Sequence, residues 1–268
     1  KILQQMSDVY RRIRNTIRFM LGNLAGFQPS ADRVSREELP EIDRYILAQF
    51  YRLTERVIKA YDDYEFHVVY HAVHNFCTVD LSSFYLDVVK DRLYCDAPDS
   101  LSRRAAQTVI CEILAGLVRL IAPILVHTAE EAWEHLPEEL RDGPSVHFST
   151  WPTVAKSILD ESAEEKWGQF MAVRREVAKA LEQARMEKTI GSSNDAGVTI
   201  YPDAEFYQVL NQFDTGELEA LFIVSEVEIA EPGSPAPDSA WTGEDGRLKV
   251  LVRPPKGEKC ARCWRYSP

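Results

Sequence analysis

Apolar residues recur every three or four positions through the first half of the chain, and this spacing predicts amphipathic helices. The first predicted helix fills most of residues 1–29, and the same spacing predicts helices at about residues 39–61 and 66–92. One side of the first helix carries the apolar residues Ile2, Met6, Val9, Ile13, Ile17, Met20 and Leu24. These helices each have one face suited to a shared core.

A strongly apolar fourth helix is predicted from about Asp99, with a bend or break at Pro123, because proline lacks the amide that an inner helical turn requires. A fifth, short helix follows, in which Thr128 and Glu131 have the spacing of a capping box. Four or five amphipathic helices in a row, with short connections between them, predict an antiparallel bundle.

The second half of the chain has a different pattern. Pro, Gly and Ser residues between Pro137 and about Leu159 predict a connector, and a long helix is predicted at about residues 161–187. After Gly191, short extended runs predict strands in AGVTIYP, FIVSEVEIA and RLKVLVRPP. A helical stretch, AEFYQVLNQF, separates the first two runs. This part is expected to be a small mixed α/β subdomain.

Together these elements predict a mainly α protein, in which an antiparallel helix bundle is followed by a long helix and a small α/β subdomain. The expected boundaries are residues 1–140 for the bundle, 141–190 for the connector and long helix, and 191–268 for the α/β subdomain. No run of about 18 apolar residues and no secretory signal is present, so neither a membrane span nor export is expected. Five cysteines without a disulfide-like framework favour a reducing, cytoplasmic location.

The formal charge of −11 argues against a generally basic surface for nucleic acid. Residues 1–29 nevertheless hold five basic side chains against Asp8 alone, a local charge of +4. At about 100° per residue, four side chains fall almost opposite the apolar stripe: Arg11, Arg14, Asn15 and Arg18. Guanidinium groups suit phosphate recognition, but a solvated or salt-bridged face fits the same pattern. The residues alone leave both interpretations open.

Cys260 and Cys263 form a spaced pair in the stretch GEKCARCW. Two thiolates at this spacing can supply two of the four ligands of a tetrahedral zinc ion. The sequence reaches Pro268 without a second pair, so we expect a truncated, incomplete zinc site; a redox pair or a coincidence are the alternatives. Trp264 is expected either to stack on an unpaired base or to cover the cysteine pair.

Three histidines lie on one side of the third predicted helix: His67, His71 and His74. No glutamate stands in the general-base position of a zinc hydrolase, so packing or surface hydrogen bonding is their expected role. The chain also lacks a phosphate loop, a dinucleotide-binding turn and a nucleophile elbow. We therefore expect no catalytic residue in this chain.

Several stretches resemble the C-terminal part of bacterial isoleucyl-tRNA synthetase: SDVYRRIRNTIRFMLGNLAGF, EIDRYILAQF, YEFHVVYHAVHNFCTVDLSSFYLDVVKDRLYCD, APILVHTAEEAWEHLP and GEKCARCWRYSP. The resemblance implies an anticodon-binding helical bundle of the class I synthetase type, followed by a C-terminal extension that ends in a zinc module near the anticodon loop. With it, the expected RNA-binding residues are Arg11, Arg14, Asn15, Arg18 and Trp264, and the expected zinc ligands are Cys260 and Cys263.

The resemblance also implies the partners, which are an isoleucine tRNA and the catalytic and editing domains of the same polypeptide. ATP and magnesium belong to the catalytic domain, whose HIGH and KMSKS signatures this sequence lacks. The chain is therefore expected to be a non-catalytic, monomeric part of an isoleucine–tRNA ligase. One alternative is a helical scaffold for protein interactions, and another is the equivalent domain of valyl-, leucyl- or methionyl-tRNA synthetase. The stretch GEKCARCW argues against the second.

Overall fold

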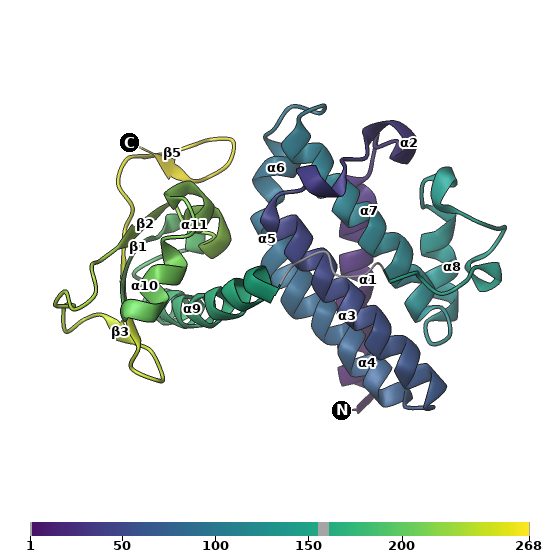
Figure 1. Cartoon of the computed structure of the whole chain (residues 1–268), viewed down its shortest axis with the longest axis horizontal. Coiled ribbons are helices and arrows are strands. Elements are labelled where there is room, and N and C mark those ends of the chain that lie inside the picture. The colour runs from purple at the N-terminus through teal and green to yellow at the C-terminus, as the bar shows by residue number, and fades with distance from the viewer. Residues whose placement is uncertain (1, 155–160, 268) are drawn as a thin grey trace. The chain divides into compact units, whose positions relative to one another are not determined.

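The computed structural model describes residues 2–154 and 161–267, which fold into two compact units, residues 1–159 and residues 160–268 (Figure 1). Lys1, Pro268 and residues 155–160 of the predicted connector lie outside the described residues. The structure confirms a mainly α protein with a small α/β part. Within the described part of the chain, no helix combines the length and the apolar character needed to cross a bilayer.

Unit 1 has only helices as its regular structure in the described residues. The longer helices are α1 (Ile2–Asn23), α3 (Glu41–Asp62), α4 (Phe66–Asn75), α7 (Leu101–Ile121) and α8 (Val126–Glu134). Shorter helical segments join them: α2 (Pro29–Asp32), η1 (Arg36–Glu38), η2 (Phe76–Tyr85), α5 (Leu86–Val88), α6 (Lys90–Tyr94), η3 (Glu138–Leu140) and η4 (Val146–Phe148).

Helix α7 is the centre of unit 1. Its residues from Ala105 to Ile121 are almost all buried, and it packs against α1, α3, α6 and α8. Ser100 caps the helix, because its hydroxyl accepts a hydrogen bond from the backbone amide of Arg103 at 3.2 Å. The helix ends at Ile121, two residues before Pro123, so the predicted break is confirmed. An all-round apolar helix of this kind is stable only when neighbours surround it.

The single helix predicted at residues 66–92 is interrupted in the structure. After α4 the chain forms a ten-residue π-helix, η2, before α5 and α6. The buried side chains of η2 are Phe76, Cys77, Leu81, Phe84 and Tyr85. The hydrogen bonds of a π-helix run from residue i to residue i+5, so each turn is wider than in an α-helix. The apolar pattern therefore predicted a helix but did not reveal its wider turns.

The capping box predicted at Thr128 and Glu131 is wrong. Helix α8 begins at Val126, so Thr128 already has helical backbone geometry and cannot precede the first turn. Its hydroxyl lies 3.1 Å from the hydroxyl of Tyr10 on α1. Glu131 forms an ion pair with Arg14, also on α1. Both side chains thus join two helices instead of capping one.

A buried ion pair holds α3 against α6. The carboxylate of Asp43 is inaccessible to solvent, and Arg92 donates to its two oxygens at 3.0 and 2.6 Å. The hydroxyl of Tyr85 donates to the same carboxylate at 2.7 Å, and Arg92 also donates to the carbonyl of Ser102 at 2.8 Å. The buried charge is therefore both paired and hydrogen-bonded, as an interior carboxylate must be.

Unit 2 packs the long helix α9 (Glu161–Met186) against a four-stranded sheet. The strand order is β2-β1-β4-β3, with β1 parallel to β2 and antiparallel to β4. The elements are η5 (Ser193–Asp195), β1 (Gly197–Pro202), α10 (Ala204–Leu210), α11 (Thr215–Phe222), β2 (Glu226–Ile229), β3 (Trp241–Thr242), β4 (Leu248–Arg253), β5 (Glu258–Lys259) and β6 (Tyr266–Ser267).

The long helix, the three predicted strands and α10 are confirmed, whereas α11, β3 and the β5–β6 hairpin were not predicted. The core of unit 2 is aromatic: Trp167 and Phe170 of α9 are buried and contact the ring of Phe213. Phe222 of α11 packs on Phe170, with ring centroids 5.4 Å apart. This packing fixes α9 against the helices that flank the sheet.

Candidate functional site

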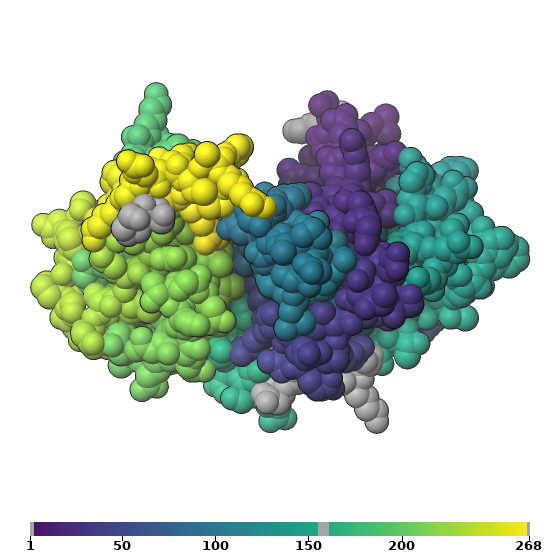
Figure 2. Space-filling view, turned by 90° about the horizontal axis from the view of Figure 1, so that it is seen from above, coloured from purple at the N-terminus to yellow at the C-terminus, as the bar shows by residue number. Residues whose placement is uncertain are grey.

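Helix α1 has the two faces that its sequence predicts. Its apolar stripe is buried from Ile13 onwards, while Met6 nearer the N-terminus is 49% exposed. On the other face, Arg11, Asn15 and Arg18 are exposed. Figure 2 shows α1, in purple, at the surface of unit 1. The structure therefore places the predicted RNA-binding side chains of α1 on a face open to solvent.

The surroundings of these side chains differ. Arg14 is half-buried and uses both terminal nitrogens to bind the carboxylate of Glu131 on α8, with Nη2 and Oε1 2.8 Å apart. The same guanidinium also donates to the hydroxyl of Tyr10 at 3.4 Å. These hydrogen bonds raise the pKa of Arg14 and lower the pKa of Glu131. A phosphate could bind the paired donors of Arg14 only by replacing Glu131.

The other three predicted side chains, Arg11, Asn15 and Arg18, are more accessible to an RNA phosphate than Arg14. Arg11 pairs with Asp8 on its own helix at 3.4 Å, and both side chains are more than half exposed. Within residues 2–154 and 161–267, Asn15 and Arg18 have no side-chain hydrogen bond or ion pair. An exposed i,i+3 pair such as Arg11–Asp8 is weak and easily exchanged for another anion. Arg11, Asn15 and Arg18 thus form the open part of the face, and we call them the α1 cationic face.

A pocket of about 330 Å³ adjoins this face where α1 meets η2. Arg12 and Asn15 line it from α1, and hydroxyl groups line it from η2, at Thr78, Ser82 and Ser83. Sequence reasoning did not select Arg12 or these hydroxyls. In the sequence these hydroxyl groups appear as three polar residues within a predicted helix that is otherwise strongly apolar. Which of them lie close to α1 depends on the π-helix and could not be predicted.

The cysteine pair lies at the tip of the β5–β6 hairpin. The amide of Arg262 donates to the sulfur of Cys260 at 3.4 Å, and the amide of Trp264 donates to the carbonyl of Cys260 at 3.0 Å. Trp264 has a φ of 64°, which turns the chain tightly after Cys263. Hydrogen bonds from Cys263 and Arg262 lower the pKa of the Cys260 thiol. The thiolate, which is the form that binds metal, is therefore favoured.

These residues fit one half of a zinc site. The tight turn and the amide directed at sulfur suit two cysteine ligands on one ion, and zinc would tie the hairpin tip together. A structural zinc ion needs four ligands. Among the described residues, no group of three or more His, Cys, Asp or Glu side chains could hold a metal ion. Cys260 and Cys263 are thus brought together, but the described residues do not complete a four-ligand site.

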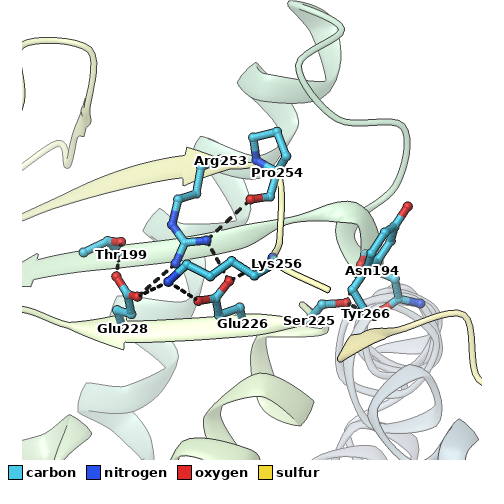
Figure 3. A network of polar contacts seen from close by, with 9 residues as sticks. All are labelled: Asn194, Thr199, Ser225, Glu226, Glu228, Arg253, Pro254, Lys256 and Tyr266. Atoms are coloured by element: carbon cyan, nitrogen blue, oxygen red, sulfur yellow. Dashed lines mark hydrogen bonds and ion pairs between the residues drawn. The ribbon is translucent and has the colours of Figure 1, made fainter. Parts of the chain in front are cut away.

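The hairpin is fixed to the sheet by one serine (Figure 3). The hydroxyl of Ser225 donates to the carbonyl of Asn194 at 2.6 Å and accepts a hydrogen bond from the amide of Tyr266 at 2.8 Å. On the other strand of the hairpin, Lys259 pairs with Asp195 of η5 at 2.7 Å. Both strands of the hairpin are therefore anchored next to β2.

An ion-pair network crosses the adjoining edge of the sheet (Figure 3). Arg253 of β4 pairs with Glu226 at 2.7 Å and with Glu228 at 3.1 Å, both on β2. Lys256 adds a second cation 3.3 Å from Glu226. The hydrogen bond from Arg253, followed by the smaller effects of Lys256, lowers the pKa of Glu226 to about 2. Glu226 therefore stays ionised at any pH at which most carboxylates are ionised.

Replacing Glu226 with glutamine is expected to reduce the acid dependence of stability. Because its pKa falls from 4.5 to about 2 on folding, the carboxylate stabilises the fold above about pH 5 and loses this effect as the pH falls towards 2. The lowered pKa corresponds to at most about 3 kcal/mol. Urea unfolding of both proteins at about pH 6 and about pH 3 measures the difference. Glu258→Gln, at an exposed position on β5, is the control, and equal pH dependence in the parent and Glu226→Gln would contradict the prediction.

A second cationic stretch surrounds the hairpin. Residues 253–266 contain five basic side chains against Glu258 alone, a local charge of +4 in the sequence. Three of the five pair with carboxylates elsewhere in unit 2, as described above for Arg253, Lys256 and Lys259. Trp264 is 65% exposed, and its neighbour Arg262 is also exposed. Figure 2 shows this segment, in yellow, at the surface of unit 2. Sequence reasoning selected Trp264 but did not count the basic side chains around it.

Comparison with known proteins gives a consistent picture. The family described as anticodon-binding domain of tRNA ligase matches residues 43–200. The chain is 49% identical over 267 residues to isoleucine–tRNA ligase of Moorella thermoacetica, covering 99% of this chain and 29% of that protein. It is 50% identical over 269 residues to the enzyme of Carboxydothermus hydrogenoformans and 44% identical over 272 residues to that of Natranaerobius thermophilus, covering 100% of this chain and 28% and 29% of those proteins. The chain thus spans less than a third of the length of these curated relatives.

Proposed function

The chain belongs to the family of anticodon-binding domains of tRNA ligases, and on this premise we propose that it binds the anticodon stem-loop of an isoleucine tRNA as part of an isoleucine–tRNA ligase. The observation that carries the proposal is the identity of 44–50% to isoleucine–tRNA ligases over 99–100% of the chain. The family match alone supports a tRNA ligase, whereas the identity over nearly the whole of this chain supports isoleucine as the amino acid.

In this proposal the chain holds the tRNA and other parts of the parent enzyme perform the chemistry. ATP-dependent aminoacylation, with its magnesium ion, is assigned to a catalytic domain of the same polypeptide, and proofreading to an editing domain. Zinc is assigned to Cys260 and Cys263 together with two ligands outside the described residues, where it would stabilise the hairpin. The parent enzyme is proposed to act in the cytoplasm as a monomer.

The two local positive charges support a division of roles in tRNA binding. Residues Arg11, Asn15 and Arg18 of the α1 cationic face are assigned to phosphate groups, since guanidinium contacts to phosphates set the register of an RNA. Trp264 is assigned to stacking on an unpaired base, because it is 65% exposed beside basic residues. Arg14 is assigned to RNA binding only if a phosphate first replaces the carboxylate of Glu131 as the partner of its guanidinium. The rest of the chain carries a net negative charge, which disfavours RNA bound in many other orientations.

We assign residues 1–140 to the anticodon-binding bundle, 141–190 to the connector and long helix, and 191–268 to the C-terminal subdomain. The family match, residues 43–200, extends across the boundary between the two compact units. The long helix α9 therefore belongs to unit 2 by packing but to the anticodon-binding family by sequence.

Titration of the chain with tRNA transcripts tests the proposal. An isoleucine tRNA is expected to bind at least about tenfold more tightly than a tRNA with another anticodon, a difference of about 1.4 kcal/mol. Affinity is expected to fall steeply with salt, because phosphate contacts release counterions. Equal affinity for the isoleucine tRNA and for a bulk polyanion such as heparin would overturn the proposal. Binding to neither would leave the scaffold interpretation as the better account.

A further inference from the structure

A second pocket, of about 470 Å³, opens between α3 and α4 on unit 1. Residues 63–65 join these two helices into a hairpin, so positions equally far from the turn lie side by side. Arg56 of α3 and His71 of α4 both line the pocket. The residues that line the pocket are Gln49, Arg52, Leu53, Arg56, His71, Ala72, His74, Asn75, Phe76 and Asp80.

The lining offers cations and hydrogen-bond donors that the described residues do not use. Arg56 and His71 are exposed, and neither has a side-chain hydrogen bond or ion pair within residues 2–154 and 161–267. The Nε2 atom of His74 is buried and has no hydrogen-bond partner in the described part of the chain. A buried polar atom without a hydrogen-bond partner carries an energetic cost.

Charged groups gather around the pocket. Burial lowers the pKa of His74, and nearby charge on Arg12 and His71 lowers it further. Asp80 is the one carboxylate among the lining residues, and burial raises its pKa to about 6. Arg52 and Arg56 of α3 and the two histidines of α4 line the pocket together with Asp80. The two guanidinium groups outnumber the single carboxylate, so the lining favours an anion.

We propose that this pocket binds a phosphate group, with the guanidinium of Arg56 paired to its oxygens and His71 and His74 as further donors. Planar guanidinium donors match two phosphate oxygens at once, and a neutral imidazole supplies one N–H. The proposal is independent of the α1 cationic face and of the cysteine hairpin, because it uses none of their residues. The phosphate belongs either to an RNA backbone or to a free phosphorylated small molecule.

Nuclear magnetic resonance of the imidazole nitrogens tests the proposal on the whole chain. Titration with inorganic pyrophosphate is expected to shift the ring signals of His71 and His74 saturably, while those of His127 and His135, which do not line the pocket, stay unchanged. If all the histidines shift alike without saturation, or if none shifts, there is no phosphate site in this pocket. This result needs no variant and is therefore unaffected by folding defects.

Three variants sharpen the test. Arg56→Gln is expected to weaken pyrophosphate binding by roughly tenfold or more, since it removes charge-assisted hydrogen bonds. Asp80→Asn is expected to strengthen binding by roughly three- to tenfold, because a like charge leaves the pocket. Lys59→Gln is the matched control, because Lys59 is exposed on the same helix and does not line the pocket. A purely structural Asp80 would not give tighter binding, and weaker binding by Asp80→Asn would contradict the proposal.

The same variants distinguish the source of the phosphate. If it comes from RNA, a short RNA competes with pyrophosphate for the His71 and His74 shifts, and Arg56→Gln weakens RNA and pyrophosphate alike. If it comes from a small molecule, RNA does not compete and Arg56→Gln changes only the pyrophosphate affinity. Both outcomes support the phosphate site. The tRNA titration described above can fail while either of them holds, so the two proposals are tested separately.

Discussion

Replacing Asp43 with asparagine is expected to lower the free energy of unfolding by roughly 3–5 kcal/mol. Asparagine keeps the shape of the side chain but leaves the Arg92 guanidinium without its counter-charge in a site where Asp43 is fully buried. Tyr85, whose hydroxyl donates to the same carboxylate, loses a charged acceptor. Urea unfolding of the full chain, followed by far-UV circular dichroism, measures the loss.

Asp8→Asn provides the matched control for this prediction. It makes the same chemical change in an exposed pair, since Asp8 and its partner Arg11 are both more than half accessible. The midpoint of unfolding is expected to stay almost unchanged, because exposed pairs contribute little. Equal losses in Asp43→Asn and Asp8→Asn would mean that burial is not the source of the effect.

Reversing Arg11 and Arg18 together to glutamate is expected to weaken binding of isoleucine tRNA on the order of 100-fold. Each reversal removes a cation from the α1 cationic face and adds a repelling charge next to the phosphates. Both side chains are exposed and outside the apolar stripe, so the fold is expected to be unaffected. Filter binding or fluorescence anisotropy at several salt concentrations measures the affinity, and the salt slope is expected to fall by about 2.

The control for this prediction makes the same change in net charge elsewhere. Arg141 and Lys249 are exposed and lie outside both cationic stretches. Arg141→Glu combined with Lys249→Glu is expected to reduce affinity far less, through the long-range field alone. If the two double variants weaken binding equally, then general charge rather than the α1 cationic face accounts for the attraction.

Most of the fold followed from local patterns in the sequence. The long helix α9 has a regular apolar stripe, and its predicted bounds agree with Glu161–Met186 almost to the residue. Pro123 ends α7 because proline has no backbone amide to donate within a helix, whatever packs around it. The misplaced capping box shows the limit of such patterns, because Thr128 and Glu131 have the right spacing but are used by Tyr10 and Arg14 from a distant part of the chain. Local spacing cannot reveal a tertiary partner.

The candidate site shows the same limit. The sequence placed Arg14 with Arg11 and Arg18 on one helix face, which follows from helical geometry alone. That Arg14 has a carboxylate partner depends on where α8 packs, 117 residues further along the chain. The pocket between α3 and α4 could not be predicted either. The sequence shows its histidines on one side of a helix, but the arginines of α3 line the same pocket only once the two helices have folded into a hairpin.

The anchoring of the cysteine hairpin by Ser225 has a consequence for the thermodynamics of binding there. A loop that moves freely in solution loses conformational entropy when a ligand fixes it, and that loss subtracts from affinity. Here the hydroxyl of Ser225 already holds the backbone at Tyr266, and Lys259 holds the opposite strand. Much of the ordering is thus complete before any metal ion or base arrives, so a larger share of each new contact is retained as net affinity. Ser225→Ala would return that ordering cost to the binding step.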